Sequence, residues 1–468
     1  MSSHSHNYDL VVIGSGPGGY VAAIRATQKG LKTAVVERDA LGGICLNWGC
    51  IPTKALLKNA EIIQTMKRAE EFGLKFSDLS FDFQRIIKRS REVAEMNSKG
   101  VEYLFKKNKI EHIAGWGKLV DAHTISVTDK GGKESRKVSA KKIIVASGGR
   151  ARMFPGVEFD GKRIITSKEA MLLDQPPKKM MIIGAGAIGV EFAYFYNSFG
   201  TEVHLIEMLP HILPIEDAEI SSQLERSFKK QGIKIYTNTK VEKLQKSAKG
   251  VKVQLSSDGK NSELEGEVAL VAIGVQGNVE NLGLEEVGIL VEKNAIKVNE
   301  FYQTNVPDVY AIGDVIGPPW LAHVASHEGI IAADHLSGGK PSPLDYTNVP
   351  GCTYCQPQVA SIGLTEEKAK ARGYELKIGK FPFRASGKAR AIGETDGLVK
   401  LIFDAKYGEL LGAHIIGAEA TELIAELGIA KALETTQHEL QHTIHAHPTL
   451  SEAIMEAAAD AIGQSIHI

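Results

Sequence analysis

The sequence predicts an α/β protein in which two sheets of the same construction precede a C-terminal α+β domain. The chain has 468 residues, which is too long for one ordinary hydrophobic core. An apolar strand, a glycine-rich turn, a helix and a second strand occur in that order twice, at 8–37 and 178–207. After about residue 350 the pattern changes to short strands followed by helices, which indicates a separate domain.

The two repeats agree in spacing as well as in order. Each glycine-rich turn has the pattern GxGxxG, and in each repeat an acidic residue ends the second strand, 23 positions after the first glycine. The glycines are Gly14, Gly16 and Gly19 in the first repeat and Gly184, Gly186 and Gly189 in the second, and the acidic residues are Glu37 and Glu207. One such pattern is a weak signal, but two copies, each between a strand and a helix, are a strong one.

The spacing of these residues has a physical reason. The first glycine forms a tight turn, the second lets the backbone approach a pyrophosphate, and the third lets helix and strand pack closely. The phosphates then lie at the helix N-terminus, where N–H groups and the helix dipole favour negative charge, while the acidic residue accepts hydrogen bonds from ribose hydroxyls. The sequence therefore predicts two Rossmann-like domains that each bind a dinucleotide.

The remaining segments complete this plan. A helical stretch is expected at about 53–106, and short strands are expected around the turn at 129–133. Apolar strands that end in glycine are expected to return to the parallel sheets at 141–149, 267–275 and 308–315. In the C-terminal domain, strands are expected at 359–364, 398–403 and 413–417, and helices at 419–434 and 449–463. The predicted domains are 1–150, 151–280, 281–350 (completing the first nucleotide site) and 351–468.

Composition excludes several classes of protein. The formal net charge is −1, so no overall field favours nucleic acid or an anionic membrane. No apolar run approaches the roughly 18 residues of a membrane-spanning helix, and the N-terminal MSSHSHNYDL does not resemble a secretory signal. Four cysteines in so long a chain are typical of a reducing compartment. We therefore expect a cytoplasmic protein with no nucleic-acid or membrane partner.

Two of the four cysteines, Cys45 and Cys50, lie in GGICLNWGCIPTK, residues 42–54. They are either an incidental pair of buried thiols or a working disulfide, and a disulfide in the cytosol is usually catalytic or redox-sensing. The segment follows Glu37 closely, so a redox role would place it beside the ligand of the first repeat. FAD suits that position, because its ring passes electrons to sulfur whereas nicotinamide alone rarely does.

The second repeat is then expected to bind a nicotinamide that exchanges with solvent. Glu207 is followed by Met-Leu-Pro-His, with no Arg or Lys beside the acid. A 2′-phosphate would be repelled by Glu207 and would require a cation there, so NAD is favoured over NADP.

Together these motifs resemble those of the pyridine nucleotide-disulfide oxidoreductase family over nearly the whole chain. The resemblance rests also on TNVPDVYAIGD (304–314) and HAHPTLSE (445–452). It implies a homodimeric flavoprotein that oxidises protein-bound dihydrolipoamide to lipoamide through a Cys45–Cys50 disulfide and FAD, with NAD as acceptor. The implied partners are lipoyl domains of the acyltransferase of a 2-oxo acid dehydrogenase complex, with the glycine cleavage carrier protein as a second candidate.

The resemblance also implies roles for individual residues. Lys54 would pair with Glu191 near the flavin ring, Asp314 would contact the ribityl chain of FAD, and Gly115 would lie against its adenine. Gly274 would lie beside NAD. The other implied flavin-binding positions are Ser147, Gly148 and Ala322. No metal site is implied.

The spacing of Cys45 and Cys50 has a structural consequence. In a regular helix, five residues separate two Cα atoms by about 7.5 Å along the axis and turn them roughly 140° apart. A disulfide requires Cα atoms within about 7 Å, so a bond here needs a distorted first turn, for which Gly49 is suited. So small a loop contributes on the order of 2 kcal/mol before strain, and strained, accessible disulfides are labile. A redox role is therefore favoured over a stabilising one.

Thiol–disulfide exchange at neutral pH benefits from a proton acceptor. Among the C-terminal histidines, His447 is distinguished by Pro448, which moves its backbone out of the helical region and onto a loop. A helix expected from 449 or 450 carries Glu452, which would orient the imidazole. The family pattern places the catalytic base at His447 and its partner at Glu452, and it implies that His447 reaches the disulfide of the other subunit.

The chain departs from the family pattern in three places. Residues 146–149 read ASGG where the family usually has ATGS, and residues 274–278 read GVQGN without the usual arginine. Cys352 and Cys355 form a CxxC, but no second CxxC or histidine pair lies near enough in sequence to complete a zinc site, so structural thiols are expected.

Other functions remain open from the sequence. Reduction of glutathione or a related small disulfide is disfavoured, because Glu207 argues against NADPH. A flavin transhydrogenase without a redox disulfide is disfavoured by Cys45 and Cys50 themselves. A mainly structural role in assembling a 2-oxo acid dehydrogenase complex is compatible with the enzymatic one.

Overall fold

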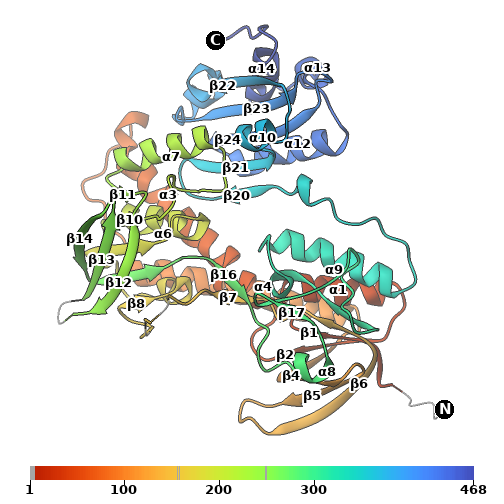
Figure 1. Ribbon diagram of the computed structural model, residues 1–468. Helices are drawn as coiled ribbons and strands as arrows, with labels where there is room; N and C mark the ends of the chain where they lie inside the picture. Colours follow the sequence, from red (N-terminus) through yellow and green to blue (C-terminus); the bar gives the residue numbers. More distant parts are fainter. Residues whose placement is uncertain (1–5, 155, 158, 248–249) are drawn as a thin grey trace. The chain divides into compact units, whose positions relative to one another are not determined.

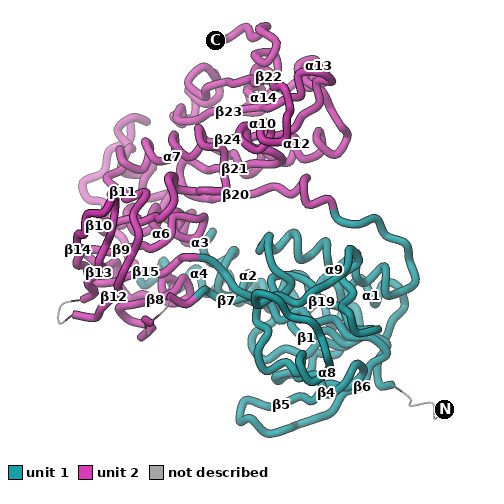
Figure 2. Tube along the Cα trace, viewed as in Figure 1, with its two compact units in different colours: residues 1–55, 84–152, 274–344 teal, residues 56–83, 153–273, 345–468 magenta. Residues whose placement is uncertain are grey.

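The computed structural model describes residues 6–154, 156–157, 159–247 and 250–468 (Figure 1). Residues 1–5, part of the N-terminal segment that does not resemble a secretory signal, lie outside the described residues. The chain divides into two compact units (Figure 2), unit 1 with residues 1–55, 84–152 and 274–344, and unit 2 with residues 56–83, 153–273 and 345–468. The division into four domains expected from the sequence stays a prediction.

Unit 1 is built on a seven-stranded sheet of order β3-β2-β1-β6-β5-β4, in which β19 also pairs with β6. The parallel strands are β1 (Tyr8–Ile13), β2 (Thr33–Glu37), β3 (Glu111–Ala114), β6 (Glu134–Val145) and β19 (Val309–Ala311). The end of β6 nearer its N-terminus pairs antiparallel with β5 (Thr124–Thr128), which pairs with β4 (Trp116–Asp121). The first repeat therefore forms the middle of a parallel sheet, and the return of 308–315 to a parallel sheet is confirmed.

Two helices of unit 1, α1 (Pro17–Gln28) and α9 (Ala322–Leu336), pack along each other in the same direction (Figure 1). Near their N-termini a Cβ on Gly18 would lie 2.9 Å from the carbonyl oxygen of Ala325. Near their C-termini Arg25 forms an ion pair of 2.7 Å with Asp334. The N-termini of both helices consequently lie side by side.

The helical stretch expected at 53–106 is interrupted. The structure contains α2 (Gly43–Trp48), α3 (Cys50–Lys67), the short 3-10 helix η1 (Ala69–Phe72) and α4 (Phe83–Lys107). Gly73 ends η1 in the left-handed conformation, with φ of 74°, and no helix follows until α4. The smaller elements of unit 1 are β7 (Gly149–Ala151), β16 (Val275–Gly277), α8 (Leu284–Val287), β17 (Val291–Glu292), β18 (Ala295–Ile296) and the 3-10 helix η2 (Gly313–Ile316).

Unit 2 contains the second repeat in a parallel sheet of order β11-β10-β9-β15-β8. Its strands are β8 (Ile164–Ile165), β9 (Lys179–Ile183), β10 (Glu202–Ile206), β11 (Lys234–Tyr236) and β15 (Val268–Val271), with α5 (Ser167–Ala170), α6 (Ala187–Ser198) and α7 (Ala218–Lys230) as the helices. An antiparallel sheet accompanies it, formed by β12 (Lys240–Lys246), β13 (Val251–Ser257) and β14 (Lys260–Gly266). No helix in the described part of the chain combines the length and the apolar character needed to cross a membrane.

The C-terminal part of unit 2 is an antiparallel sheet of order β20-β21-β24-β23-β22. Its strands are β20 (Gly351–Thr353), β21 (Gln358–Gly363), β22 (Leu376–Pro382), β23 (Leu398–Asp404) and β24 (Leu410–Gly417). Its helices are α10 (Glu366–Ala371), α11 (Gly387–Ala391), α12 (Ala420–Ala432), α13 (Gln437–His442) and α14 (Glu452–Asp460). One hydrophobic core joins α12 and α14 to this sheet. The expected α/β protein with a C-terminal α+β domain is confirmed.

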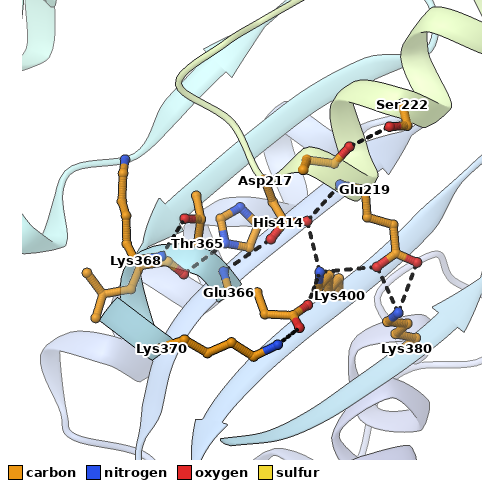
Figure 3. Close-up of polar contacts among 12 residues, drawn as sticks. Asp217, Glu219, Ser222, Thr365, Glu366, Lys368, Lys370, Lys380, Lys400 and His414 are labelled. Atoms are coloured by element: carbon orange, nitrogen blue, oxygen red, sulfur yellow. Dashed lines mark hydrogen bonds and ion pairs between the residues drawn. The ribbon is translucent and has the colours of Figure 1, made fainter. Parts of the chain in front are cut away.

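A buried ionic cluster links α7 to this C-terminal sheet (Figure 3). The Lys400 side chain on β23 is 2% exposed, and its ammonium lies 2.7 Å from Glu366, 2.9 Å from Asp217 and 3.1 Å from Glu219. Asp217 also caps α7, accepting a hydrogen bond of 3.1 Å from the Glu219 N–H. A charge buried this deeply is tolerated because each member of the cluster has partners.

Candidate active site

The three glycines of the first repeat have different steric environments. A Cβ on Gly14, whose φ is +102°, would lie 2.2 Å from the carbonyl oxygen of Ala146, and a Cβ on Gly19 would lie 2.0 Å from that of Gly14. A Cβ on Gly16 would meet nothing within 4 Å. The turn therefore needs its first and third glycines for its own packing, whereas the second, at the N-cap of α1, leaves open space for a phosphate.

The second repeat reproduces this arrangement. A Cβ on Gly184 would lie 2.4 Å from the carbonyl oxygen of Ala272, and a Cβ on Gly189 would lie 1.9 Å from that of Gly184. Gly186, at the N-cap of α6, again has nothing within 4 Å of its Cβ position. The two turns are thus built alike, as their spacing predicts.

The acidic residue of each repeat is held against its own glycine turn. The Glu37 carboxylate accepts hydrogen bonds from the Ser15 N–H at 2.9 Å and the Asp39 N–H at 2.9 Å. The Glu207 carboxylate accepts the equivalent bonds from Ala185 at 2.8 Å and Leu209 at 2.9 Å. Both carboxylates are therefore fixed beside the phosphate position, where a ribose follows the pyrophosphate.

Further residues of unit 1 suit FAD. Ala322 is the first residue of α9, whose N-terminus lies beside that of α1, so two helix dipoles favour negative charge there. Asp314 lies in η2, against Gly149, whose Cβ would be 3.1 Å from the carboxylate. Burial raises the pKa of Asp314 to about 6, and hydroxyl groups of a ribityl chain are suitable partners for such a carboxyl group.

The two cysteines lie in separate helical segments. Cys45 belongs to α2 and Cys50 begins α3, and the helix is interrupted at Gly49, with φ of −149° and ψ of −116°. The distortion expected from the spacing is therefore present. The segment also contacts the first glycine turn: the Gly42 N–H donates to the Ser15 carbonyl at 3.1 Å, and a Cβ on Gly43 would lie 2.7 Å from the Gly16 Cα.

Both cysteines are present as thiols, Cys45 partly buried and Cys50 exposed. A side-chain hydrogen bond with Cys50, together with burial, raises the pKa of the Cys45 thiol above its usual range, while the charge of Lys54 acts in the opposite direction. The side chains of Cys45 and Cys50 therefore interact across the break at Gly49.

Two residues that sequence reasoning missed anchor this segment. The Asn47 side-chain amide donates to the carbonyl oxygens of Leu41 at 2.9 Å and Gly43 at 3.0 Å. The Arg91 guanidinium lies 4.4 Å from the centre of the Trp48 ring and donates to the Asn47 carbonyl oxygen. No motif marks Arg91, which comes from α4, far along the chain.

Two of the three segments that depart from the family pattern, 146–149 and 274–278, are joined to each other by hydrogen bonds. The Ser147 hydroxyl donates to the Asn278 carbonyl oxygen at 2.9 Å, and the Asn278 amide donates to the Ser147 carbonyl oxygen at 2.9 Å. The Asn278 N–H also donates to the Gly148 carbonyl oxygen at 2.9 Å.

Gly115 adopts φ of +144°, and Gly274 adopts φ of +120°. Both lie in unit 1, and their contacts with adenine and with NAD stay predictions.

In unit 2, Glu191 on α6 is buried, and its carboxylate accepts a hydrogen bond of 3.0 Å from the Tyr354 N–H. Lys54, the partner expected from the family pattern, belongs to unit 1. Their pairing therefore stays a prediction.

The expected base lies on a loop, as Pro448 indicates. The His447–Pro448 peptide bond is cis, and Nδ1 of His447 lies 2.9 Å from Oε1 of Glu452. Oε2 of Glu452 accepts a hydrogen bond of 2.8 Å from the Thr449 N–H. Burial opposes ionisation of Glu452, but the hydrogen bonds from Thr449 and His447 prevail and lower its pKa. Glu452 is the first residue of α14, two or three residues later than the start expected at 449 or 450.

Cys352 and Cys355, the second cysteine pair, lie in the C-terminal part of unit 2. The Cys355 thiol is buried and donates to the Pro357 carbonyl oxygen at 3.2 Å. Cys352 is partly buried beside the core of the C-terminal sheet. Among the described residues, no group of three His, Cys, Asp or Glu side chains is arranged to hold a metal ion.

The architecture and this arrangement of residues define a flavin- and nicotinamide-binding class of disulfide oxidoreductase. Residues 8–329 match the pyridine nucleotide-disulphide oxidoreductase family, and residues 349–458 match its dimerisation domain. The chain belongs to this family and uses FAD and NAD, and the dimerisation domain supports a homodimer.

Individual relatives carry more specific names. The chain is 52% identical to a dihydrolipoyl dehydrogenase of Zymomonas mobilis over 100% of both chains. It is 47% identical to a dihydrolipoyl dehydrogenase of Bacillus subtilis, over 98% of this chain and 99% of the relative. The crystal structure of LpdA from Mycobacterium tuberculosis is similar with a TM-score of 0.89 at 30% identity, covering 96% of this chain and 98% of that one.

Proposed function

We propose that this protein oxidises the dihydrolipoyl group to the lipoyl group, with NAD as the final electron acceptor. The observation that carries the proposal is the position of the Cys45–Cys50 segment, which is broken at Gly49 and held against the first glycine turn. The similarity to dihydrolipoyl dehydrogenases over the whole chain supports the choice of substrate.

The chain's own residues can perform the sulfur chemistry. Nδ1 of His447 donates to Glu452, which leaves Nε2 of the neutral imidazole to take a proton from a dihydrolipoyl thiol. The resulting thiolate attacks Cys45 of the oxidised enzyme and displaces Cys50 as a thiolate. The second dihydrolipoyl sulfur then displaces Cys45, which leaves a lipoyl disulfide and an enzyme dithiol. The family pattern assigns this order of the two cysteines and supplies the base as His447 of the partner subunit.

When bound, FAD supplies the means of passing the electron pair from the dithiol to NAD. Gly14, Gly16, Gly19, Glu37 and Asp314 would hold it, with Ala322 at the second helix N-terminus. In unit 2, Glu207 would bind the ribose of NAD. Its carboxylate is fixed by two backbone N–H groups, and the exposed Met208 beside it offers no positive charge to a 2′-phosphate.

The proposal extends to partners and compartment. Lipoyl domains of a 2-oxo acid dehydrogenase complex acyltransferase are the expected macromolecular substrates, with the glycine cleavage carrier protein as the second candidate. The sparing use of cysteine favours the reducing cytoplasm.

Steady-state oxidation of dihydrolipoamide by NAD, followed as NADH formation, tests the proposal. We expect Cys50→Ser to lower kcat by at least about a thousandfold, because exchange then lacks its second sulfur. Cys352→Ser, the same chemical change at a cysteine of the C-terminal sheet, is the matched control and should retain most of the activity. Full turnover by the Cys50→Ser enzyme would refute the redox role. A flavin-loaded native protein without turnover would favour the assembly role instead.

A further inference from the structure

A second histidine–glutamate pair lies beside the proposed base. His445 precedes His447 on the same loop, and Nε2 of His445 lies 2.7 Å from Oε1 of Glu426 on α12. Its other ring nitrogen, Nδ1, lies 2.9 Å from the Thr443 carbonyl oxygen. Unlike His447, whose side chain is 79% exposed, the His445 side chain is only 5% exposed. The His445 side chain is therefore buried in this pair, whereas the Glu426 side chain is 36% exposed.

The contacts of His445 determine its protonation. A carboxylate and a backbone carbonyl are both acceptors, so each ring nitrogen must donate a hydrogen. A neutral imidazole has only one N–H group, and only the imidazolium satisfies both partners. In agreement, the hydrogen bond to Glu426, which outweighs burial, raises the pKa of His445.

His445 and Glu452 influence each other's ionisation. Glu426 on α12 and Glu452 on α14 both favour the protonated form of His445. Reciprocally, the charge of His445 favours the ionised form of Glu452, which is the carboxylate bonded to His447. On α13, the remaining neighbouring element, His442 is turned to the His438 carbonyl oxygen at 2.8 Å.

We infer that His445 is a positioning residue, held as an imidazolium by its two acceptors, Glu426 and the Thr443 carbonyl oxygen. Its positive charge partly neutralises Glu452 and so limits how tightly His447 holds its proton. A base whose proton affinity is lowered in this way can deprotonate the dihydrolipoyl thiol at lower pH, and it releases the proton more readily afterwards. The inference rests on the proposed function, since it assigns a role within that reaction.

The pH dependence of kcat/KM for dihydrolipoamide tests the inference, measured on the flavin-loaded homodimer. We expect His445→Gln and Glu426→Gln each to move the midpoint of the acid limb to higher pH by at least about 0.5 pH unit, because Glu452 then attracts the proton on His447 more strongly. His445→Lys restores a positive charge without an imidazole and should return the midpoint toward that of the native enzyme. Glu422→Gln, the same change on an exposed residue of α12, is the matched control and should leave it unmoved.

Two results would overturn the inference. In the first, His445→Gln and Glu426→Gln lower kcat/KM equally at every pH, which is the signature of a purely structural role. In the second, His445→Lys shifts the midpoint as far as His445→Gln, so that charge is not the cause. Should Glu426→Gln fail to fold, the comparison of Gln with Lys at position 445 decides alone. Failure of the proposed function is distinguishable, because the native enzyme itself would then not oxidise dihydrolipoamide.

Discussion

The three glycines of each glycine-rich turn have different roles, in packing or in leaving space for a phosphate, and this difference can be measured. Gly16 has open space where a Cβ would lie, so Gly16→Ala should fold normally but obstruct the pyrophosphate of FAD. We expect the purified variant to bind FAD at least about tenfold more weakly, a loss of about 1.4 kcal/mol. The flavin absorbance per protein during titration of the flavin-free variant with FAD measures this loss.

Gly186→Ala is the matched control for this prediction, because Gly186 has the same open environment in the second repeat. It should retain FAD while its KM for NAD rises about tenfold. Undiminished FAD affinity in Gly16→Ala would contradict the assignment of the first repeat to the flavin.

Residue positions were predictable where local spacing determines them. Glu37 and Glu207 lie where the spacing of the GxGxxG repeats places them, because one turn and one helix separate each from the first glycine of its repeat. Asn278 was not predictable as a partner of Ser147, since the two are 131 positions apart and neither belongs to a periodic pattern. His445 was passed over for a related reason: its pairing with Glu426 depends on how α12 packs beside the loop.

At the scale of secondary structure, the sequence predicts the elements with a clear apolar pattern correctly, but it does not predict where a helix is interrupted. The apolar strand expected at the start of the first repeat is β1 (Tyr8–Ile13), which begins at residue 8 as the repeat does. The single helical stretch at 53–106 is instead α3, η1 and α4, because Gly73 ends η1 and residues 73–82 form no helix. Hydrophobic periodicity shows which segments are buried. An interruption of a helix that tertiary contacts stabilise changes this periodicity little.

The Lys400 cluster allows a prediction about how elements are held together. Lys400→Met would leave the Asp217 carboxylate, whose side chain is 3% exposed, without its cation, whereas Glu366 would keep Lys370 at 2.6 Å. We therefore expect the free energy of unfolding to fall by about 3 kcal/mol. Lys380→Met is the control: Lys380 pairs with the same Glu219 at 2.8 Å but is 40% exposed, and its loss should cost less than about 1 kcal/mol. Urea unfolding of the two variants makes the comparison, and equal losses would contradict it.

The same cluster gives stability a defined pH dependence. Burial alone would raise the pKa of Asp217, but the hydrogen bond from Lys400 prevails and lowers it below the usual 3.8. A carboxylate with a lowered pKa contributes stability that is present above its unfolded pKa and lost as the pH falls through its folded pKa. Lys400→Met has already lost this contribution at neutral pH, so its stability should fall less steeply below about pH 4 than that of the native protein.

At the scale of the whole molecule, the sequence predicts contiguous domains more readily than long-range association. The return of 308–315 to a parallel sheet was expected and is seen as β19 beside β6. The grouping of 274–344 with the N-terminal segments in one compact unit depends on such pairings between distant residues. A strand pattern shows that a segment joins a sheet, but several sheets compete for it and the pattern does not choose among them.

The family's dimerisation domain, residues 349–458, leads to a prediction about the whole assembly. In the single chain the apolar side chains of Leu433 and Ile444 are 73% and 96% exposed, and a homodimer would bury such residues. We expect Leu433→Glu and Ile444→Glu each to raise the Kd of the dimer by at least about 100-fold, or about 2.7 kcal/mol. Sedimentation velocity measures the dimer, and dihydrolipoamide oxidation should fall with it because the proposed base comes from the partner. Ile215→Glu, at a residue 75% exposed outside this domain, should change neither, whereas monomeric variants with full activity would show that each subunit supplies its own base.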